Sequence, residues 1–273
     1  MIYPQPALLT LYGDYARGSN GEIGIGSIVK LLGNFGLSEQ SIRSAVSRMC
    51  HANLLKVRKV GRKSYYSLTE DGRNLLTKSG QRIFWPKGIP WDSSWMIVTY
   101  SIPEQKRKAR DRLRTELSWM GCGALSDATW ISPYDITKEV EELVERLKIR
   151  NNVHIFHAKH LGFSDPKEIV SRSWNLNKTH EKYASFLTRY RPKLEALQKI
   201  IRSGKDIKPS ECFVERFSII HEYRKLPFFD PDLPKELLPS KWLRPEANTL
   251  FREYLELVTH KAKEYFNLVI SKY

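Results

Sequence analysis

The chain has 273 residues, of which 41% are hydrophobic, and a formal net charge of +15. It contains no apolar run long enough to span a bilayer and no charged, apolar and small-residue leader, so we expect a soluble protein of the cytoplasm. Three isolated cysteines, Cys50, Cys122 and Cys212, form no CxxC pair, which argues against a disulfide framework and a thiolate zinc site. The length predicts two or three domains.

The positive charge is concentrated in the first third of the chain. Residues 1–90 hold 13 Lys and Arg against 5 Asp and Glu, whereas residues 91–175 hold 13 against 12 and residues 176–273 hold 19 against 13. A local excess of this kind is typical of proteins that bind a polyanion such as nucleic acid, although it also serves solubility.

Three helices are predicted near the N-terminus. Residues 6–16 and 26–36 repeat apolar side chains at helical spacing, and a short apolar segment, 22–25, lies between them. Ser38 is a good N-cap for the third helix, with Glu39 in its first turn. The buried stripe of that helix is predicted from four apolar residues at positions i, i+3, i+4 and i+7: Ile42, Ala45, Val46 and Met49.

The opposite face of the third helix carries small hydroxyls and arginines. Its residues are Ser41, Arg43, Ser44, Ser47 and Arg48. Such a face suits the major groove of DNA, because small hydroxyls permit close approach while arginines reach guanine edges or phosphates.

A basic β-hairpin is predicted to follow this helix. Five cations fall within eight positions: Lys56, Arg58, Lys59, Arg62 and Lys63. Leu55 and Val57 alternate with them, Gly61 provides the turn, and Tyr66 and Leu68 are expected on the same apolar side as Leu55 and Val57. Thr69 is then a suitable cap for a helix over residues 70–84.

Three helices, a short strand and a hairpin in this order predict a winged helix-turn-helix domain over residues 1–90. The helix face is expected to contact bases, and the hairpin residues Lys56, Arg58, Arg62 and Lys63 are expected to hold phosphates of double-stranded DNA. Taken singly, each element also fits an ordinary solvated helix or ribbon. The order of the elements in the most basic third favours the DNA-binding interpretation.

The middle of the chain alternates strands and helices. Apolar strand patterns at 95–102, 128–134 and 153–158 are separated by helical patterns at 104–120 and 137–149. This order predicts a ferredoxin-like α/β sandwich over residues 91–173, with the helices on one face of the sheet. Six cations on the first helix and its approach, between Lys106 and Arg114, indicate a solvated helix, with a supplementary phosphate contact as the alternative.

This middle domain is similar to the fold of CRISPR-adaptation nucleases, so a metal-dependent nuclease is the alternative function. Those enzymes hold a metal with an aspartate at the end of the first strand, where this chain has Tyr100 and Ser101. The nearest acids, Glu104 and Asp111, are expected to be solvated. We therefore expect no enzyme activity, no catalytic residue and no metal site.

Three histidines, His154, His157 and His160, are spaced by three residues in a segment that is predicted to be a strand leading into a loop. Positions i and i+3 of a strand point to opposite faces. Surface or pocket histidines are therefore expected rather than metal ligands.

The last third, residues 174–273, is predicted to be a helical effector and dimerisation domain, which completes an α+β fold. Apolar residues repeat with a period of 3.5 between Tyr183 and Ile201, which predicts a helix-helix seam, although Pro192 falls inside it. Packing within the chain is the default for this seam, and a subunit interface is the alternative. An amphipathic helix over 211–226, a proline-rich segment and a final helix over 245–270 follow.

Six segments of the chain form a recognisable set in their order and spacing. They are LYGDY at 11–15, IRSAVSRM at 42–49, GRKSYYSLTEDG at 61–72, WMIVTYSIPE at 95–104, TWISPYD at 129–135 and HEYRKLPFFDPDLPKELLPSKW at 221–242. In these segments the chain resembles the PaaX-type family of phenylacetate-degradation transcriptional repressors. Two places depart from the pattern. Asn53 and Leu54 replace a glycine-led turn, which asparagine tolerates, and LRPEA follows Trp242 where the family turns through Pro-Gly.

The resemblance implies a sequence-specific, homodimeric repressor of an aromatic or acyl-CoA catabolic operon. The family's repressors leave DNA on binding an aryl-CoA or acyl-CoA thioester such as phenylacetyl-CoA, and no cofactor is expected. Such an effector needs an apolar slot and cations for its phosphates. The candidate ligand-binding residues are Phe213, Phe217, Tyr223, Arg224, Lys225 and Trp242, with structural roles as the alternative.

Overall fold

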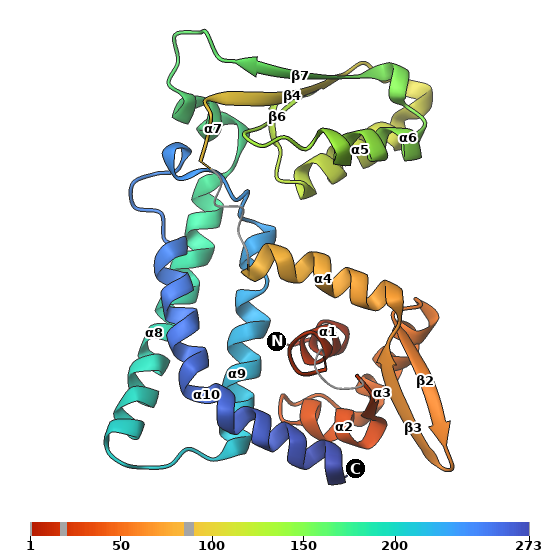
Figure 1. Ribbon diagram of the computed structural model, residues 1–273, viewed down its shortest axis with the longest axis vertical. Helices are drawn as coiled ribbons and strands as arrows, with labels where there is room; N and C mark the ends of the chain where they lie inside the picture. Colours follow the sequence, from red (N-terminus) through yellow and green to blue (C-terminus); the bar gives the residue numbers. More distant parts are fainter. Residues whose placement is uncertain (1, 17–20, 85–89, 273) are drawn as a thin grey trace. The chain divides into compact units, whose positions relative to one another are not determined.

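Two small antiparallel sheets and a set of long C-terminal helices make up the computed structural model, a mixed α/β fold (Figure 1). The structure describes residues 2–16, 21–84 and 90–272, without the side chains of 78–84. The chain forms two compact units. Unit 1 comprises residues 1–85, 184–225 and 244–273, and unit 2 comprises residues 86–183 and 226–243. Residues 174–273 therefore contribute to both units.

Unit 1 contains the first sheet and most of the helices. Its elements are α1 (Pro4–Tyr15), β1 (Ile23–Gly24), α2 (Ile25–Gly33), α3 (Glu39–His51), β2 (Leu55–Val60), β3 (Lys63–Leu68), α4 (Glu70–Phe84), most of α8 (Leu176–Arg202), α9 (Pro209–Tyr223) and α10 (Arg244–Lys272).

Helices α1 to α3 form where the apolar spacing predicts them. The expected faces are buried, with Leu8 and Leu11 of α1 and Ile42 and Met49 of α3 fully inaccessible to solvent. The predicted cap of α3 is confirmed, because Ser38 Oγ accepts a hydrogen bond from the backbone N–H of Ser41 at 3.3 Å.

The first sheet has the strand order β1-β3-β2, and the β2–β3 hairpin pairs Leu55 with Leu68 and Val60 with Lys63. Gly61 takes a φ of +56° in the two-residue turn, a backbone conformation that glycine adopts without steric cost. Leu55 is paired with Leu68 and Val57 with Tyr66, so these residues share one side of the hairpin as expected, although Val57 is 48% exposed. Only the base of the hairpin reaches the helices, so Leu55 and Leu68 are buried and the outer part is solvated.

A tight corner joins α3, β2, β3 and α4. Asn53 adopts a left-handed φ of +54°, a conformation that asparagine tolerates. Thr69 Oγ1 donates to the Asn53 carbonyl at 2.5 Å and accepts from the Gly72 N–H at 3.0 Å, which confirms Thr69 as the cap of α4. A Cβ on Gly72 would lie only 2.2 Å from the Leu54 carbonyl oxygen, so the corner requires glycine there.

The C-terminal helices pack on the N-terminal ones. Arg216 of α9 is only 8% exposed, and its guanidinium donates to Asp14 of α1 and to Thr259 of α10, both at 2.6 Å. Ser27 of α2 donates to the Val269 carbonyl of α10 at 3.3 Å. Helices α9 and α10 therefore fix the positions of α1 and α2.

The predicted seam of α8 packs within the chain, as the default interpretation held. Leu187, Tyr190, Leu194 and Leu197 are buried, and the Tyr190 ring lies 5.8 Å from Tyr254 of α10. Ile201, at the end of the seam, is exposed. The helix continues through Pro192 without interruption.

Unit 2 is built on the second sheet. Its elements are β4 (Ser94–Tyr100), the 3₁₀ turn η1 (Glu104–Lys106), α5 (Arg107–Trp119), β5 (Gly123–Ser126), β6 (Thr129–Ser132), α6 (Thr137–Leu147), η2 (Arg150–Asn152), β7 (Val153–Lys159), α7 (Pro166–Ser173), the start of α8, η3 (Leu226–Phe228) and η4 (Lys235–Leu237).

The antiparallel strand order β5-β6-β4-β7 and the β-α-β-β-α-β succession are those of a ferredoxin-like fold. Helices α5 and α6 lie on one face of the sheet, as expected (Figure 1). The strand predicted at 128–134 is confirmed as β6, but the sequence did not predict β5, which pairs with β6 to form a hairpin. Strand β5 is short and begins at the last glycine of the GCG segment, 121–123, and glycines in such a segment indicate a turn instead of a strand.

Among the helices whose residues are described, none combines the length and apolar character that a membrane crossing needs.

Replacing Gly72 by alanine tests the corner. We expect Gly72→Ala to lower the free energy of unfolding by about 1–3 kcal/mol, because the new Cβ must displace a backbone carbonyl. Gly33→Ala is the matched control, since nothing lies within 4 Å of its Cβ position, and it should be neutral or stabilising by about 0.4–1 kcal/mol. Urea titration measures both variants, and equal stabilities would contradict the close approach.

Candidate nucleic-acid interface

The solvent face of α3 carries the predicted hydroxyl and arginine side chains. Arg43, Ser44, Ser47 and Arg48 are exposed, and Ser41 is half-buried. The Arg48 guanidinium donates to Ser44 Oγ at 2.7 Å, and Arg43 pairs with Glu39 at 2.7 Å. Both contacts join neighbours one turn apart on the exposed surface, where such contacts are weak and easily exchanged for a ligand.

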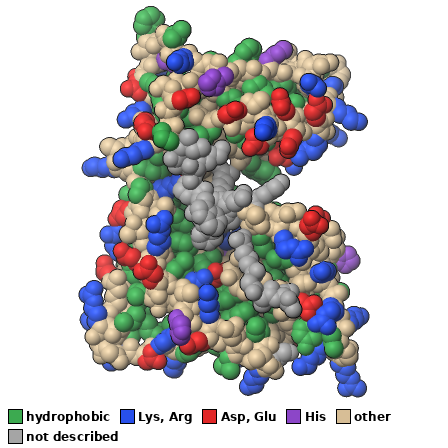
Figure 2. All heavy atoms as spheres, viewed as in Figure 1, with side chains coloured by type: hydrophobic (Ala, Val, Ile, Leu, Met, Phe, Trp, Pro, Cys, Tyr) green, Lys and Arg blue, Asp and Glu red, His purple; other side chains and the backbone are tan. Residues whose placement is uncertain are grey.

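The β2–β3 hairpin presents a second group of cations. Lys56, Arg62 and Lys63 are exposed, and none of them forms an ion pair with another described residue. Figure 2 shows Lys and Arg side chains at the tip of this hairpin, at the lower right of the view. Exposed cations without acidic partners are available to phosphates.

Arg58 differs from the other hairpin cations because it already has a carboxylate partner. Its guanidinium donates to Glu22 at 2.9 and 3.0 Å and lies 5.3 Å from the centre of the Tyr65 ring. These hydrogen bonds hold the pKa of the Glu22 carboxyl below its ordinary value. Sequence reasoning missed the pair because β1 brings Glu22 beside the hairpin through pairing of Ile23 with Tyr66, a non-local contact.

The hairpin is held in a fixed relation to α3. The corner at Asn53 is closed by Thr69 and by a 2.7 Å hydrogen bond from Asn53 Nδ2 to Asp71. The Tyr12 hydroxyl of α1 also donates to the Tyr66 carbonyl of β3 at 2.9 Å. The helix face and the basic hairpin are therefore held together as one surface of defined geometry, and both parts carry cationic side chains.

The cations of α5 are mostly paired inside unit 2. Arg107 and Arg110 contact Glu104, and Arg112 contacts Glu116 at 2.6 Å. Figure 2 shows Lys and Arg intermixed with Asp and Glu over this region. This pattern fits a solvated helix covering the sheet and offers little for a phosphate contact.

The end of β4 gives the nuclease alternative no support. The Tyr100 hydroxyl donates to the Asp127 carbonyl at 2.7 Å, and Glu104 is engaged by arginines. No cluster of three or more His, Cys, Asp or Glu side chains suited to a metal occurs in the described part of the chain. His154, His157 and His160 are exposed on or after β7, as surface histidines.

The six predicted ligand-binding residues are divided between the two units. Five belong to unit 1 and Trp242 belongs to unit 2. Phe213 and Phe217 are fully buried, and Phe217 packs 4.3 Å from Phe35 of the α2–α3 connection. The Tyr223 ring stacks on Phe251 at 3.9 Å. In unit 1 these rings are packed against other aromatic side chains of the core.

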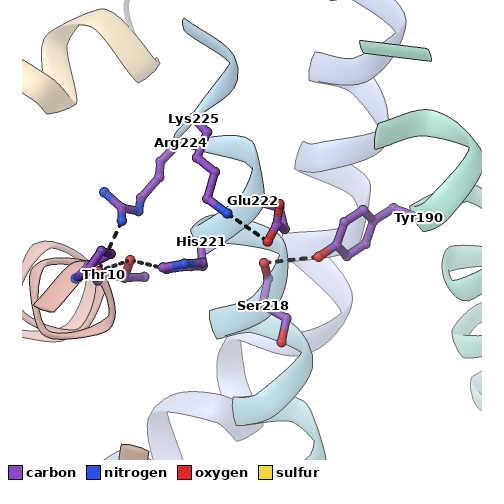
Figure 3. A network of polar contacts seen from close by, with 8 residues as sticks. Thr10, Tyr190, Ser218, His221, Glu222, Arg224 and Lys225 are labelled. Carbon is purple, nitrogen blue, oxygen red and sulfur yellow. Dashed lines mark hydrogen bonds and ion pairs between the residues drawn. The ribbon is translucent and has the colours of Figure 1, made fainter. Parts of the chain in front are cut away.

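Arg224 and Lys225 belong to a polar network between α1, α8 and α9 (Figure 3). Arg224 donates to the Pro6 carbonyl at 3.1 Å, and Lys225 pairs with Glu222 at 2.9 Å. Burial holds the pKa of the Arg224 guanidinium below its ordinary value. Both residues thus have structural partners.

His221 is the buried centre of this network, and sequence reasoning did not single it out. Figure 3 shows it directed at Thr10 of α1, with 2.9 Å between His221 Nδ1 and Thr10 Oγ1. Burial, followed by the positive charges of Arg224 and Lys225, lowers the pKa of His221 to about 4. The imidazole is therefore neutral at physiological pH.

Comparison with known proteins covers almost the whole chain. Three family models match in succession: "PaaX-like protein" at residues 4–72, "PaaX protein central Cas2-like domain" at 89–170 and "PaaX-like protein C-terminal domain" at 174–268. A protein of Escherichia coli (strain K12), "Transcriptional repressor PaaX", is 29% identical over 244 residues, which are 88% of this chain and 76% of that protein.

A solved structure, "Uncharacterized protein Rv0674 from Mycobacterium tuberculosis", is similar with a TM-score of 0.60 at 17% identity. The similarity covers 97% of this chain and 99% of that one, and it concerns the fold alone.

Together these matches define a three-part chain with a Cas2-like central domain. The protein belongs to the PaaX family, as the motif resemblance predicted.

The buried state of His221 predicts a pH-dependent stability. Its folded-state pKa of about 4 lies below the ordinary value of 6.5, so only the unfolded chain takes up a proton as the pH falls below 6.5. The stability that the neutral imidazole contributes is thus present above pH 6.5 and lost toward pH 4. When the pH falls from 7 to 5, we expect protonation of this residue in the unfolded chain to lower the free energy of unfolding of the wild type by about 2 kcal/mol.

His221→Asn should flatten this part of the pH profile, because asparagine keeps a donor near Thr10 and does not titrate. His260→Asn on α10 is the control, because it removes an exposed histidine, which pairs with Glu264, and leaves the buried contact of His221 with Thr10 in place. Urea titrations at pH 7 and pH 5 give the comparison, and parallel losses in wild type and His221→Asn would refute the assignment.

Proposed function

We propose that this chain is a sequence-specific, DNA-binding transcriptional repressor. The first 84 residues act as a winged helix-turn-helix in this proposal, with α3 as the recognition helix and the β2–β3 hairpin as the wing. The observation that carries it is the surface formed by α3 and the hairpin. The Asn53–Thr69 corner fixes these two elements to one another, and both present exposed arginines or lysines. The E. coli relative named as a transcriptional repressor supports the same role.

The two parts of this surface have different tasks. Arg43, Ser44, Ser47 and Arg48 contact base edges, and Lys56, Arg62 and Lys63 hold phosphates and set the register. Arg58 contributes less than the other hairpin cations, because Glu22 already neutralises it. A homodimer presents two such surfaces to two half-sites of a double-stranded operator.

The repressor responds to an aryl-CoA or acyl-CoA thioester, such as phenylacetyl-CoA, and controls an aromatic or acyl-CoA catabolic operon. This part of the proposal rests on the family resemblance of the motifs. A ligand releases DNA only by binding more tightly to the form with lower DNA affinity. Helices α9 and α10 pack on α1 and α2, so a shift of the C-terminal helices reaches the DNA-binding part directly.

Binding to duplexes selected from a random pool by the wild-type chain tests the DNA contacts. Arg48→Ala should lose on the order of 1–3 kcal/mol on selected duplexes and relax the base preference. Arg62→Ala should weaken selected and unrelated duplexes alike and reduce the salt slope by about one unit. Arg58→Ala, the matched control on the same hairpin, should change the slope less than Arg62→Ala does. Normal binding by both Arg48→Ala and Arg62→Ala would rule out this interface.

Displacement from the selected duplex tests the effector. Phenylacetyl-CoA is expected to release the DNA and to raise the melting temperature of the free protein, because a ligand that binds the folded state stabilises it. Free phenylacetate should do neither. Retention of DNA at saturating phenylacetyl-CoA, with no thermal shift, would remove the effector from the proposal and leave the repressor role.

A further inference from the structure

Four tryptophans gather on the sheet face of unit 2 that α5 and α6 leave uncovered. We call Trp91, Trp95, Trp174 and Trp242 the tryptophan cluster. The ring centres of Trp91 and Trp95 are 5.1 Å apart, and those of Trp95 and Trp174 are 6.3 Å apart. Trp242 joins the same apolar cluster from the proline-rich segment. Aromatic side chains of this size dominate the energetics of binding sites for flat apolar groups.

The proline-rich segment 226–243, which we call the strap, is fastened over this part of unit 2 by three hydrogen bonds. Thr179 Oγ1 donates to the Phe229 carbonyl at 2.9 Å, the Tyr183 hydroxyl to Asp230 Oδ2 at 2.7 Å, and the Tyr134 hydroxyl to the Asp232 carbonyl at 2.7 Å. Leu233 and Leu237 of the strap pack in the same hydrophobic cluster as Trp95, and Trp242 is itself a residue of the strap. The strap therefore forms one wall of the cluster.

Two indole donors of the cluster are not used. Trp91 Nε1 donates to the Ser94 carbonyl at 2.7 Å and Trp174 Nε1 to the Gly121 carbonyl at 3.0 Å. Trp95 Nε1 and Trp242 Nε1 are buried without an acceptor among the described residues, and Trp95 as a whole is only 3% exposed. A buried donor without a partner costs about 1–3 kcal/mol, so a carbonyl oxygen placed there would be stabilising.

The surroundings of these donors define the chemistry of the acceptor. Many of the residues that pack with them are apolar, among them Ile131, Val170 and Leu176. The rings of His180 and Tyr183 lie 6.0 and 5.9 Å from the Trp242 ring. Burying a carboxylate in such surroundings is unfavourable unless it is paired with a cation, whereas a neutral carbonyl needs only a donor. Trp174 and Trp242 are half-buried, so the cluster is accessible from solvent at its edge.

We propose that the tryptophan cluster under the strap binds an aromatic acyl thioester, whose ring packs among the indoles and whose carbonyl oxygen accepts from Trp95 or Trp242. This inference rests on the proposed function, in which such a thioester is the effector. Of the six predicted ligand-binding residues, it uses Trp242. The strap follows α9 after Arg224 and Lys225 and ends directly before α10. A ligand that moves the strap therefore acts on both helices that hold α1 and α2.

Titration of the full chain with phenylacetyl-CoA and benzoyl-CoA tests the site. Calorimetry should show binding of at least one of these aryl thioesters, and acetyl-CoA, which lacks the ring, should bind at least tenfold more weakly. Trp95→Phe and Trp242→Phe keep an aromatic ring and remove the donor. At least one of them is expected to weaken binding roughly three- to tenfold, which corresponds to one hydrogen bond. Trp119→Phe, on exposed α5, is the control and should bind like the wild type.

A second readout does not depend on how the variants fold. The seven tryptophans of the chain are replaced by 5-fluorotryptophan, and ¹⁹F resonances are followed during the titration. Resonances of Trp95 and Trp242 should shift, while that of Trp119 should not. The proposal is overturned if neither aryl thioester binds, if both donor variants bind like the wild type, or if the shifts lie outside the cluster.

The selected duplex separates this proposal from the repressor role. A chain that selects DNA sequences but binds neither aryl thioester retains the repressor role and loses this site. A chain that binds the thioester at the cluster but shows no sequence preference in DNA retains the site and loses the repressor role.

Discussion

The packing of α9 against the N-terminal helices depends on one buried charge, the guanidinium of Arg216. A buried cation is tolerated only with partners, and here two helices provide them: Asp14 and the ring of Tyr15, at 5.7 Å, on α1, and Thr259 on α10. Loss of one partner of such a buried pair typically costs about 3–5 kcal/mol. This cost discourages any separation of α9 from α1.

Neighbouring contacts extend the same arrangement. Glu215, the residue before Arg216, accepts from Tyr254 of α10 and from Lys193 of α8, so one turn of α9 is bonded to three other helices. Burial raises the pKa of the Tyr254 hydroxyl, which therefore stays neutral and keeps its proton for this bond. Through these contacts the proposed DNA-binding surface and the C-terminal helices belong to one packed unit.

Local features of this architecture could be predicted from sequence, because they depend on neighbours in the chain. The Ser38 cap, the buried stripe from Ile42 to Met49 and the helix over Glu70–Phe84 follow from spacing and capping. The solvated state of Val57 could not be predicted, because alternation along a strand gives the side of the sheet but not the extent of the helices beneath it.

Non-local features were out of reach for a different reason. The pair between Glu22 and Arg58 and the contact of His221 with Thr10 join residues that only the tertiary fold brings together. The amphipathic pattern of α9 correctly predicted that Phe213 and Phe217 are inward, but it could not distinguish a filled core from a ligand slot. The unused donors of Trp95 and Trp242 have no signature in sequence at all.

The chain passes between the two units four times, after residues 85, 183, 225 and 243. The two units are therefore not domains that follow one another along the chain, because neither unit is a continuous stretch of sequence. The first ninety residues, separated from the remainder, would expose the apolar surfaces of α1 and α2 that α9 and α10 cover. Exchange of the N-terminal domain between relatives, a common route to new regulators, would therefore have to carry α9 and α10 with it.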